Sequence, residues 1–139
     1  MIRLQQAWRR VALLAGVTLL AGFGGLAGSW GLGPAIRWLG LAGLTAGYSF
    51  AFLKRNLGRN REFEAATLYA DLGPGTTATL LRGLLLAAVC GFLFSPRPTG
   101  LLAWAPTILF TSAELLDYLD GYLARRTGRQ TELGASFDL

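Results

Sequence analysis

Histidine is absent from this chain of 139 residues, and cysteine occurs only once, as Cys90. The absence of histidine excludes His-based acid–base catalysis and zinc sites built on histidine. A single cysteine cannot form an internal disulfide, and inside an apolar run it packs as a small hydrophobic side chain. Any chemistry in this chain therefore relies on carboxylates, arginines and hydroxyl groups.

Charge is scarce as well. Charged residues make up 15% of the chain and hydrophobic residues 53%, whereas typical soluble domains carry about a quarter charged residues. Glycine is abundant, with 19 residues, and membrane helices use glycine to approach one another closely. The composition predicts an integral membrane protein.

Four apolar runs predict transmembrane helices, because a spanning helix needs roughly 20 residues. The runs cover residues 11–29, 35–53, 76–94 and 101–116. The segment after the second run carries a broken helical stripe of apolar residues, which we interpret as an interfacial helix. The chain breaks at Thr127-Gly128 after the fourth run, and we expect it to enter a fifth helix beyond this break. We therefore predict an all-α integral membrane fold with four transmembrane helices, an interfacial amphipathic helix and the start of a fifth span.

Aromatic and small residues mark the first two runs. Trp30 and Trp38 flank the turn between them, as is typical of an interfacial aromatic belt. Small residues also repeat at intervals of four, a pattern that favours close packing of membrane helices: Gly24 with Gly28, and Gly43 with Gly47.

The distribution of basic residues predicts the orientation. A net charge of +5 could indicate a nucleic-acid partner, but the basic residues cluster between apolar runs, so we expect none. Ten of the 13 Lys and Arg residues lie in the N-terminus and in residues 54–61 and 125–129. The opposite turns contain only Arg37 and Arg97, and Arg82 lies inside the third run. The positive-inside rule then predicts a multi-pass protein of the cell (inner) membrane, with the N-terminus and both basic segments in the cytoplasm.

Carboxylates gather at the end of the fourth run. Asp117 and Asp120 are three residues apart, so they share one face of a helix, and Asp138 follows after the glycine break. Carboxylates at a membrane boundary repel one another and are costly to desolvate. A hard dication such as Mg²⁺ or Mn²⁺ offsets both effects, which predicts a metal site at the cytoplasmic surface. The alternative is a solvated helix end whose Asp residues pair with Arg125 and Arg126.

From Asp117 to Asp138 the chain reads Asp-x2-Asp-Gly-x2-Ala-Arg-x8-Gly-x3-Asp. This stretch resembles the signature of the CDP-alcohol phosphotransferase (CDP-alcohol phosphatidyltransferase) family. Upstream, Thr79-x-x-Arg82 resembles a second element of the family. The family pattern continues to a fourth Asp, the proposed general base, which would fall beyond Leu139, so the resemblance covers the N-terminal part of the family only. The catalytic base is therefore not assigned within this chain.

The resemblance implies a membrane phosphatidyltransferase of phospholipid synthesis. It would transfer a substituted phosphate from a CDP-linked lipid donor, CDP-diacylglycerol, to an alcohol acceptor with release of CMP, and it would form a homodimer. Asp117, Asp120 and Asp138 would hold the Mg²⁺ or Mn²⁺ ions. The substrate-binding residues implied by the resemblance are Thr79, Arg82, Gly121, Ala124, Arg125 and Gly134.

Three regions follow from this interpretation. Residues 1–57 form an N-terminal two-span membrane extension, residues 58–75 the interfacial helix and turn, and residues 76–139 a truncated family core. Two alternatives remain open. Arg82 could snorkel to the interface instead of binding substrate. The whole chain could also be a non-catalytic polytopic membrane protein, or a pseudoenzyme, that assembles with a partner.

Overall fold

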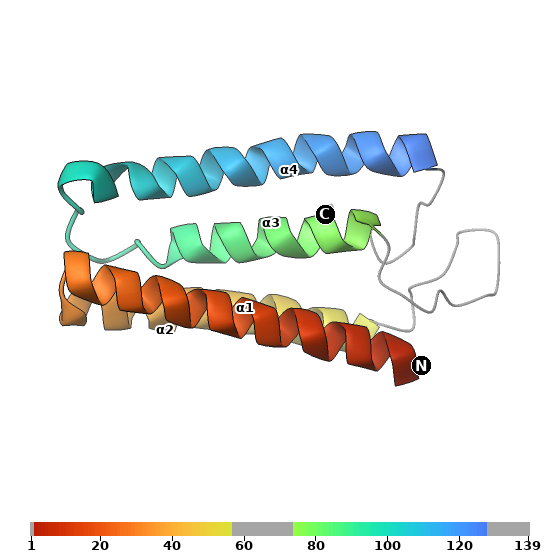
Figure 1. Cartoon of the computed structure of the whole chain (residues 1–139), viewed down its shortest axis with the longest axis horizontal. Helices are drawn as coiled ribbons and strands as arrows, with labels where there is room; N and C mark the ends of the chain where they lie inside the picture. Colours follow the sequence, from red (N-terminus) through yellow and green to blue (C-terminus); the bar gives the residue numbers. More distant parts are fainter. Residues whose placement is uncertain (1, 57–73, 128–139) are drawn as a thin grey trace.

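The computed structural model describes residues 2–56 and 74–127. Most of these residues are helical and none lies in a strand, which confirms the all-α prediction for this part of the chain. The helices lie side by side and alternate in direction, as in an up-and-down bundle (Figure 1). In chain order they are α1 (Ile2–Ser29), α2 (Leu32–Asn56), α3 (Pro74–Cys90), the 3-10 helix η2 (Gly100–Trp104) and α4 (Ala105–Thr127).

A tight turn joins α1 to α2. The Trp30 amide donates to the Leu26 carbonyl at 2.8 Å, and Gly31 follows with a φ of 101°. Only glycine adopts this left-handed backbone without a steric cost, so it ends α1. The Gly31 carbonyl then accepts from the Ala35 amide at 3.2 Å, which opens α2. The predicted turn is confirmed but is shorter than expected, because α2 begins at Leu32.

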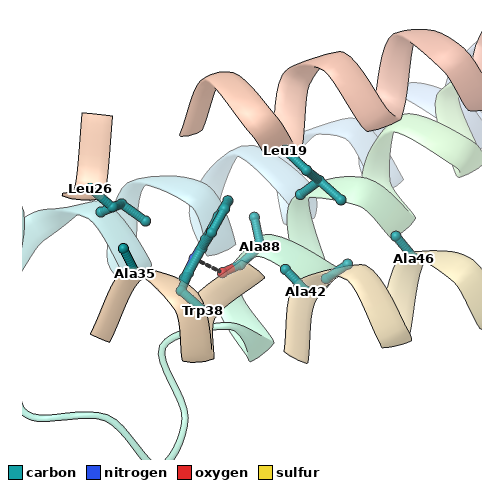
Figure 2. Packing of buried hydrophobic residues seen from close by; sticks show 8 residues of the cluster. Leu19, Leu26, Ala35, Trp38, Ala42, Ala46 and Ala88 are labelled. Atoms are coloured by element: carbon teal, nitrogen blue, oxygen red, sulfur yellow. Dashed lines mark hydrogen bonds between the residues drawn. The ribbon is translucent and has the colours of Figure 1, made fainter. Parts of the chain in front are cut away.

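Small side chains form the core between α1, α2 and α3. Along α2 the buried positions recur every three, four or seven residues, which places them on one face of the helix. Most of them are alanines, and short side chains let membrane helices pack closely. Figure 2 shows this cluster, with Leu19 and Leu26 of α1 lying against the alanines. The buried residues of α2 are Ala35, Trp38, Ala42, Ala46 and Leu53.

Trp38 joins α2 to α3. Its side chain is 4% exposed, and its indole N–H donates to the Ala88 carbonyl at 2.9 Å (Figure 2). Ala88 lies in the last turn of α3, where carbonyls lack helical donors. The Phe92 amide, the donor that a longer α-helix would supply, instead bonds to the Val89 carbonyl at 3.0 Å. The indole of Trp38 is thus buried between helices, and its predicted position at a membrane interface stays a prediction.

Glycines accommodate this indole on two sides. A Cβ atom on Gly91 would lie 2.5 Å from Trp38 Cδ1 and 2.8 Å from the Trp38 carbonyl oxygen. A Cβ atom on Gly22 of α1 would lie 2.9 Å from Trp38 Cη2. The glycine pairs expected to mediate close packing do not: a Cβ atom would meet nothing within 4 Å at any of Gly24, Gly28, Gly43 and Gly47. Alanines, together with Gly22 and Gly91, make the close contacts instead.

The end of α3 differs from the prediction of a span reaching residue 94. The helix ends at Cys90, and the Leu93 amide donates to the Cys90 carbonyl at 3.0 Å in a tightened turn. Phe94 then adopts a left-handed backbone with a φ of 60°, and prolines follow at positions 96 and 98. These prolines prevent the helix from resuming after Phe94, so the chain reverses direction before η2 and α4.

The helix ends that carry most of the basic residues lie together at one end of the bundle. The start of α1, the end of α2, the start of α3 and the end of α4 all lie there (Figure 1). Within the described residues, one helix, Gln5–Ser29, is long and apolar enough to cross a membrane, and Thr77–Cys90 is apolar but shorter. The four predicted helices are present in the described residues. That all four of them span a membrane stays a prediction. The interfacial helix and the start of a fifth span lie outside the described residues.

Candidate functional site

An ion pair connects the two segments that the sequence singled out. The guanidinium of Arg82 on α3 donates through Nη1 to Oδ1 of Asp117 on α4. The Arg82 side chain is 20% exposed and that of Asp117 52% exposed. Residues 35 positions apart in the chain thus meet because α3 and α4 pack against each other in opposite directions.

The depth of this ion pair matters for its energy. Arg82 lies eight residues after Pro74, the first residue of α3, which is roughly 12 Å along the helix axis. A guanidinium that is only 20% exposed on an apolar helix is costly unless a partner offsets its charge. Asp117 provides that partner, so the structure offers an alternative to snorkelling for Arg82.

Thr79 lies one helical turn before Arg82. Its side chain is 7% exposed, and it is the buried polar residue of the described core. Burial at this level requires a polar partner for the hydroxyl group, and Thr79 does have a polar contact in the structure. Thr79 is therefore buried in the core, and Arg82, one turn later, is largely buried as well.

A partly open cavity of about 80 Å³ lies beside these residues, between α2 and α3. Its wall is mostly apolar, with Ser49, Thr79 and Arg82 as the polar and charged exceptions. Thr79 and Arg82, two of the substrate-binding residues that the resemblance implies, both line this cavity, whereas its α2 wall was not predicted. The signal available was the run of small residues in α2, which leaves space beside a neighbouring helix. The complete wall consists of Ala46, Ser49, Phe50, Thr79, Leu80, Arg82, Gly83, Leu84 and Leu86.

The remaining motif residues divide into two groups. Asp120, Gly121, Ala124 and Arg125 lie on α4 between Asp117 and the end of the helix, and only their backbone positions are described. Asp120 is three residues beyond Asp117, a register on the same helix face. Gly134 and Asp138 lie outside the described residues. Among the side chains that the structure describes, no three acidic groups form a metal cluster, so the meeting of the three carboxylates stays a prediction.

At the same end of the bundle, a hydrogen bond and a cation–π contact join α1 to α2. The Trp8 indole N–H donates to the Phe50 carbonyl at 3.1 Å, and the Lys54 ammonium lies 5.2 Å from the centre of the Trp8 ring. A cation over an indole face is attracted by the ring quadrupole. Phe50 also lines the cavity, so this contact fixes one wall of the cavity.

Comparison with known proteins identifies the family of the C-terminal segment. Residues 76–139 match the family model for CDP-alcohol phosphatidyltransferase. The matched segment begins with α3, includes α4 and covers Thr79, Arg82 and all motif residues from Asp117 to Asp138. Neither a curated protein nor a solved structure matches the chain. The resemblance inferred from the motif is confirmed for this segment, and α1 and α2 lie outside it.

Proposed function

Starting from the match of residues 76–139 to the CDP-alcohol phosphatidyltransferases, we propose that this protein is a membrane phosphatidyltransferase of phospholipid synthesis. It transfers a substituted phosphate from CDP-diacylglycerol to an alcohol, with release of CMP. One observation carries the proposal furthest. Arg82, from the first element of the motif, contacts Asp117, from the second. Two motif elements that touch across a helix interface support a single site.

The proposed metal ligands are Asp117, Asp120 and Asp138. Carboxylate oxygens are the donors that Mg²⁺ and Mn²⁺ prefer, so this donor set fits a hard dication. The half-exposed carboxylate of Asp117 lies on the face of α4 that also carries Asp120 in register. When bound, the dication would neutralise the pyrophosphate and stabilise the departing CMP.

The protein groups around that site position the donor. The planar guanidinium of Arg82 holds the Asp117 carboxylate in place and has further N–H groups suited to phosphate oxygens. Thr79 lies one turn away and adds a hydroxyl group beside the cavity. Along α4, Gly121 and Ala124 are short enough for a nucleotide to lie against the helix.

Two further motif residues complete the proposed site. Arg125 adds positive charge near the phosphates, and Gly134 permits close contact near the cytidine. We propose that the site faces the cytoplasm, because the basic ends of α1, α2 and α4 lie at one end of the bundle with it. The four-span topology and a homodimer are part of the same proposal.

The test is CMP release. Membranes containing the full-length parent protein are incubated with CDP-dioleoylglycerol, Mn²⁺ and a panel of alcohols, and CMP is measured by chromatography. Asp120→Ala should lower the rate by about a hundredfold or more, because it removes a metal ligand. Glu114→Ala is the matched control, since Glu114 is an exposed acid on the same helix outside the motif. Chelation should abolish CMP release and Mn²⁺ should restore it. Absence of CMP release with every alcohol would overturn the proposal.

The ion pair also favours a second candidate, a non-catalytic membrane protein that assembles with a partner. A pair such as Arg82–Asp117 offsets a largely buried guanidinium between packed helices even without catalysis. The exchanged variant, Arg82→Asp with Asp117→Arg, separates the two functions. It restores the charge pair, so a structural role predicts normal stability and partner binding, whereas the transferase predicts a folded but inactive protein.

A further inference from the structure

Exposed cations gather at one end of the hairpin that α1 and α2 form. Its basic patch consists of Arg9 and Arg10 at the start of α1 and Lys54 and Arg55 at the end of α2, all with exposed side chains. These two helix ends lie at the same end of the bundle (Figure 1). The first acidic residue of the whole chain is Glu62, so neither helix supplies a counter-charge. Gathered like charges repel one another unless an anion from outside the hairpin offsets them.

One cation of the basic patch has a fixed position. The Trp8 indole donates to the Phe50 carbonyl, and Trp8 packs against the buried side chain of Leu53. The Lys54 ammonium lies 5.2 Å from the centre of this anchored ring. The ring attracts the ammonium from one side, and the three N–H groups of a lysine leave donors for an anion on the other.

Apolar residues continue from the cations along the same helix faces. Leu20 lies eleven residues after Arg9 on one face of α1 and is 60% exposed. On α2, Tyr48 and Leu44 lie seven and eleven residues before Arg55, and each is 75% exposed. Eleven residues extend roughly 16 Å along a helix, which is about half of the 30 Å hydrocarbon core of a bilayer. Each face therefore matches one phospholipid in one leaflet, charged at one end and apolar along the rest.

We infer that the hairpin of α1 and α2 binds an anionic phospholipid, with the headgroup phosphate at the basic patch and the acyl chains along these apolar faces. Among the described helices, the segment Gln5–Ser29 is long and apolar enough to cross a membrane. Arg9 and Arg10 lie in the first two turns of that segment, at the depth of the headgroups. The hairpin lies outside residues 76–139, so this lipid site does not depend on the proposed function.

The charge of the basic patch selects among phosphate-bearing ligands. A free phosphate gains only the contact with the cations, whereas a phospholipid also covers the exposed apolar faces. Phosphatidylcholine carries an ammonium group that cancels its phosphate charge and brings another cation to the patch. Phosphatidylglycerol has no such group and keeps its negative charge. Each exposed cation beside an anionic lipid should strengthen binding by about fivefold.

The experiment is native mass spectrometry of the full-length parent protein in detergent, titrated with phosphatidylglycerol and phosphatidylcholine of identical acyl chains. The wild type should bind phosphatidylglycerol more tightly, and added KCl should reduce the difference. Lys54→Gln combined with Arg55→Gln should weaken phosphatidylglycerol binding by about twentyfold and leave phosphatidylcholine binding unchanged. The matched control is Arg37→Gln combined with Arg97→Gln, which neutralises two exposed cations at the opposite end of the bundle. This control should leave the binding of both lipids unchanged.

A third variant separates a built site from a diffuse attraction between charges. Trp8→Leu keeps every cation but removes the ring beside Lys54, so phosphatidylglycerol binding should fall by about two- to fivefold. If this variant fails to fold, the two double variants decide the question, because they change only exposed side chains. Equal affinity of the wild type for the two lipids would show that carboxylates elsewhere neutralise the patch, and overturns the lipid site. Equal weakening by the two double variants, or unchanged binding in folded Trp8→Leu, overturns it as well.

Discussion

Replacing Trp38 by phenylalanine should destabilise the bundle strongly, although the residue lies far from the motif. The substitution removes the indole N–H that donates to the Ala88 carbonyl at 2.9 Å. A buried carbonyl left without a donor costs about 1–3 kcal/mol. The smaller ring also leaves a space beside Gly91 and Gly22, which costs about 1 kcal/mol more. We expect a total loss of about 2–4 kcal/mol in the free energy of unfolding.

Pulse proteolysis of the purified protein at increasing SDS fractions measures this loss, and it does not depend on tryptophan fluorescence. Trp104→Phe is the matched control, because Trp104 is 64% exposed and undergoes the same chemical change. The control should change the free energy of unfolding by less than about 0.5 kcal/mol. If Trp38→Phe is no more destabilising than Trp104→Phe, the hydrogen bond does not join α2 to α3, and the argument for a shared core fails.

Three further predictions use the same unfolding assay. Gly91→Ala should lower the free energy of unfolding by at least about 2 kcal/mol, because the new Cβ atom meets the Trp38 backbone, which no rotamer change can move. The control Gly40→Ala should be neutral or slightly stabilising. Equal effects of the two substitutions would refute the close contact. Arg82→Ala should lower the free energy of unfolding by about 1–2 kcal/mol, less than the loss of a fully buried ion pair, because Asp117 is half exposed. The exchanged variant, Arg82→Asp with Asp117→Arg, should recover most of this loss. No recovery would show that the ion pair is not the source of the loss. Trp8→Phe should lower the free energy of unfolding by about 1 kcal/mol, because the hydrogen bond to the Phe50 carbonyl is lost. The losses from Trp8→Phe and Lys54→Met should be less than additive in the double variant, because Lys54 contacts the same ring. Strict additivity would contradict the cation–π contact.

The helices were predictable because their signal is local. Apolar runs bounded by glycine, proline and basic clusters predicted four helices, and four are present in the described residues. The ends differ because they depend on contacts. The apolar residues after Cys90 continue the hydrophobic run, but the chain turns there with Gly91 packed against Trp38. Hydropathy does not predict which apolar residues pack against a neighbouring helix.

The candidate site was predictable only in part. The motif resemblance brought Thr79, Arg82 and Asp117 into one site, and the ion pair of Arg82 with Asp117 agrees with that placement. The role of Trp38 was not predictable, because a tryptophan near a span boundary has the same sequence signal at the membrane surface and between helices. Likewise, glycines at intervals of four do not reveal which helix face meets a neighbour, so the contacts of Gly22 and Gly91 emerge only in three dimensions.

The bond from Trp38 to Ala88 has a consequence for how the protein is made. Its donor and acceptor are 50 residues apart, so at a synthesis rate of about 5–20 residues per second the acceptor emerges roughly 3–10 s after the donor. The helical hairpin of α1 and α2 is complete once Asn56 has been made, and 32 more residues must follow before the Ala88 carbonyl is present to accept from the indole N–H. Packing of the hairpin into the bundle is therefore completed by a residue encoded well downstream of it.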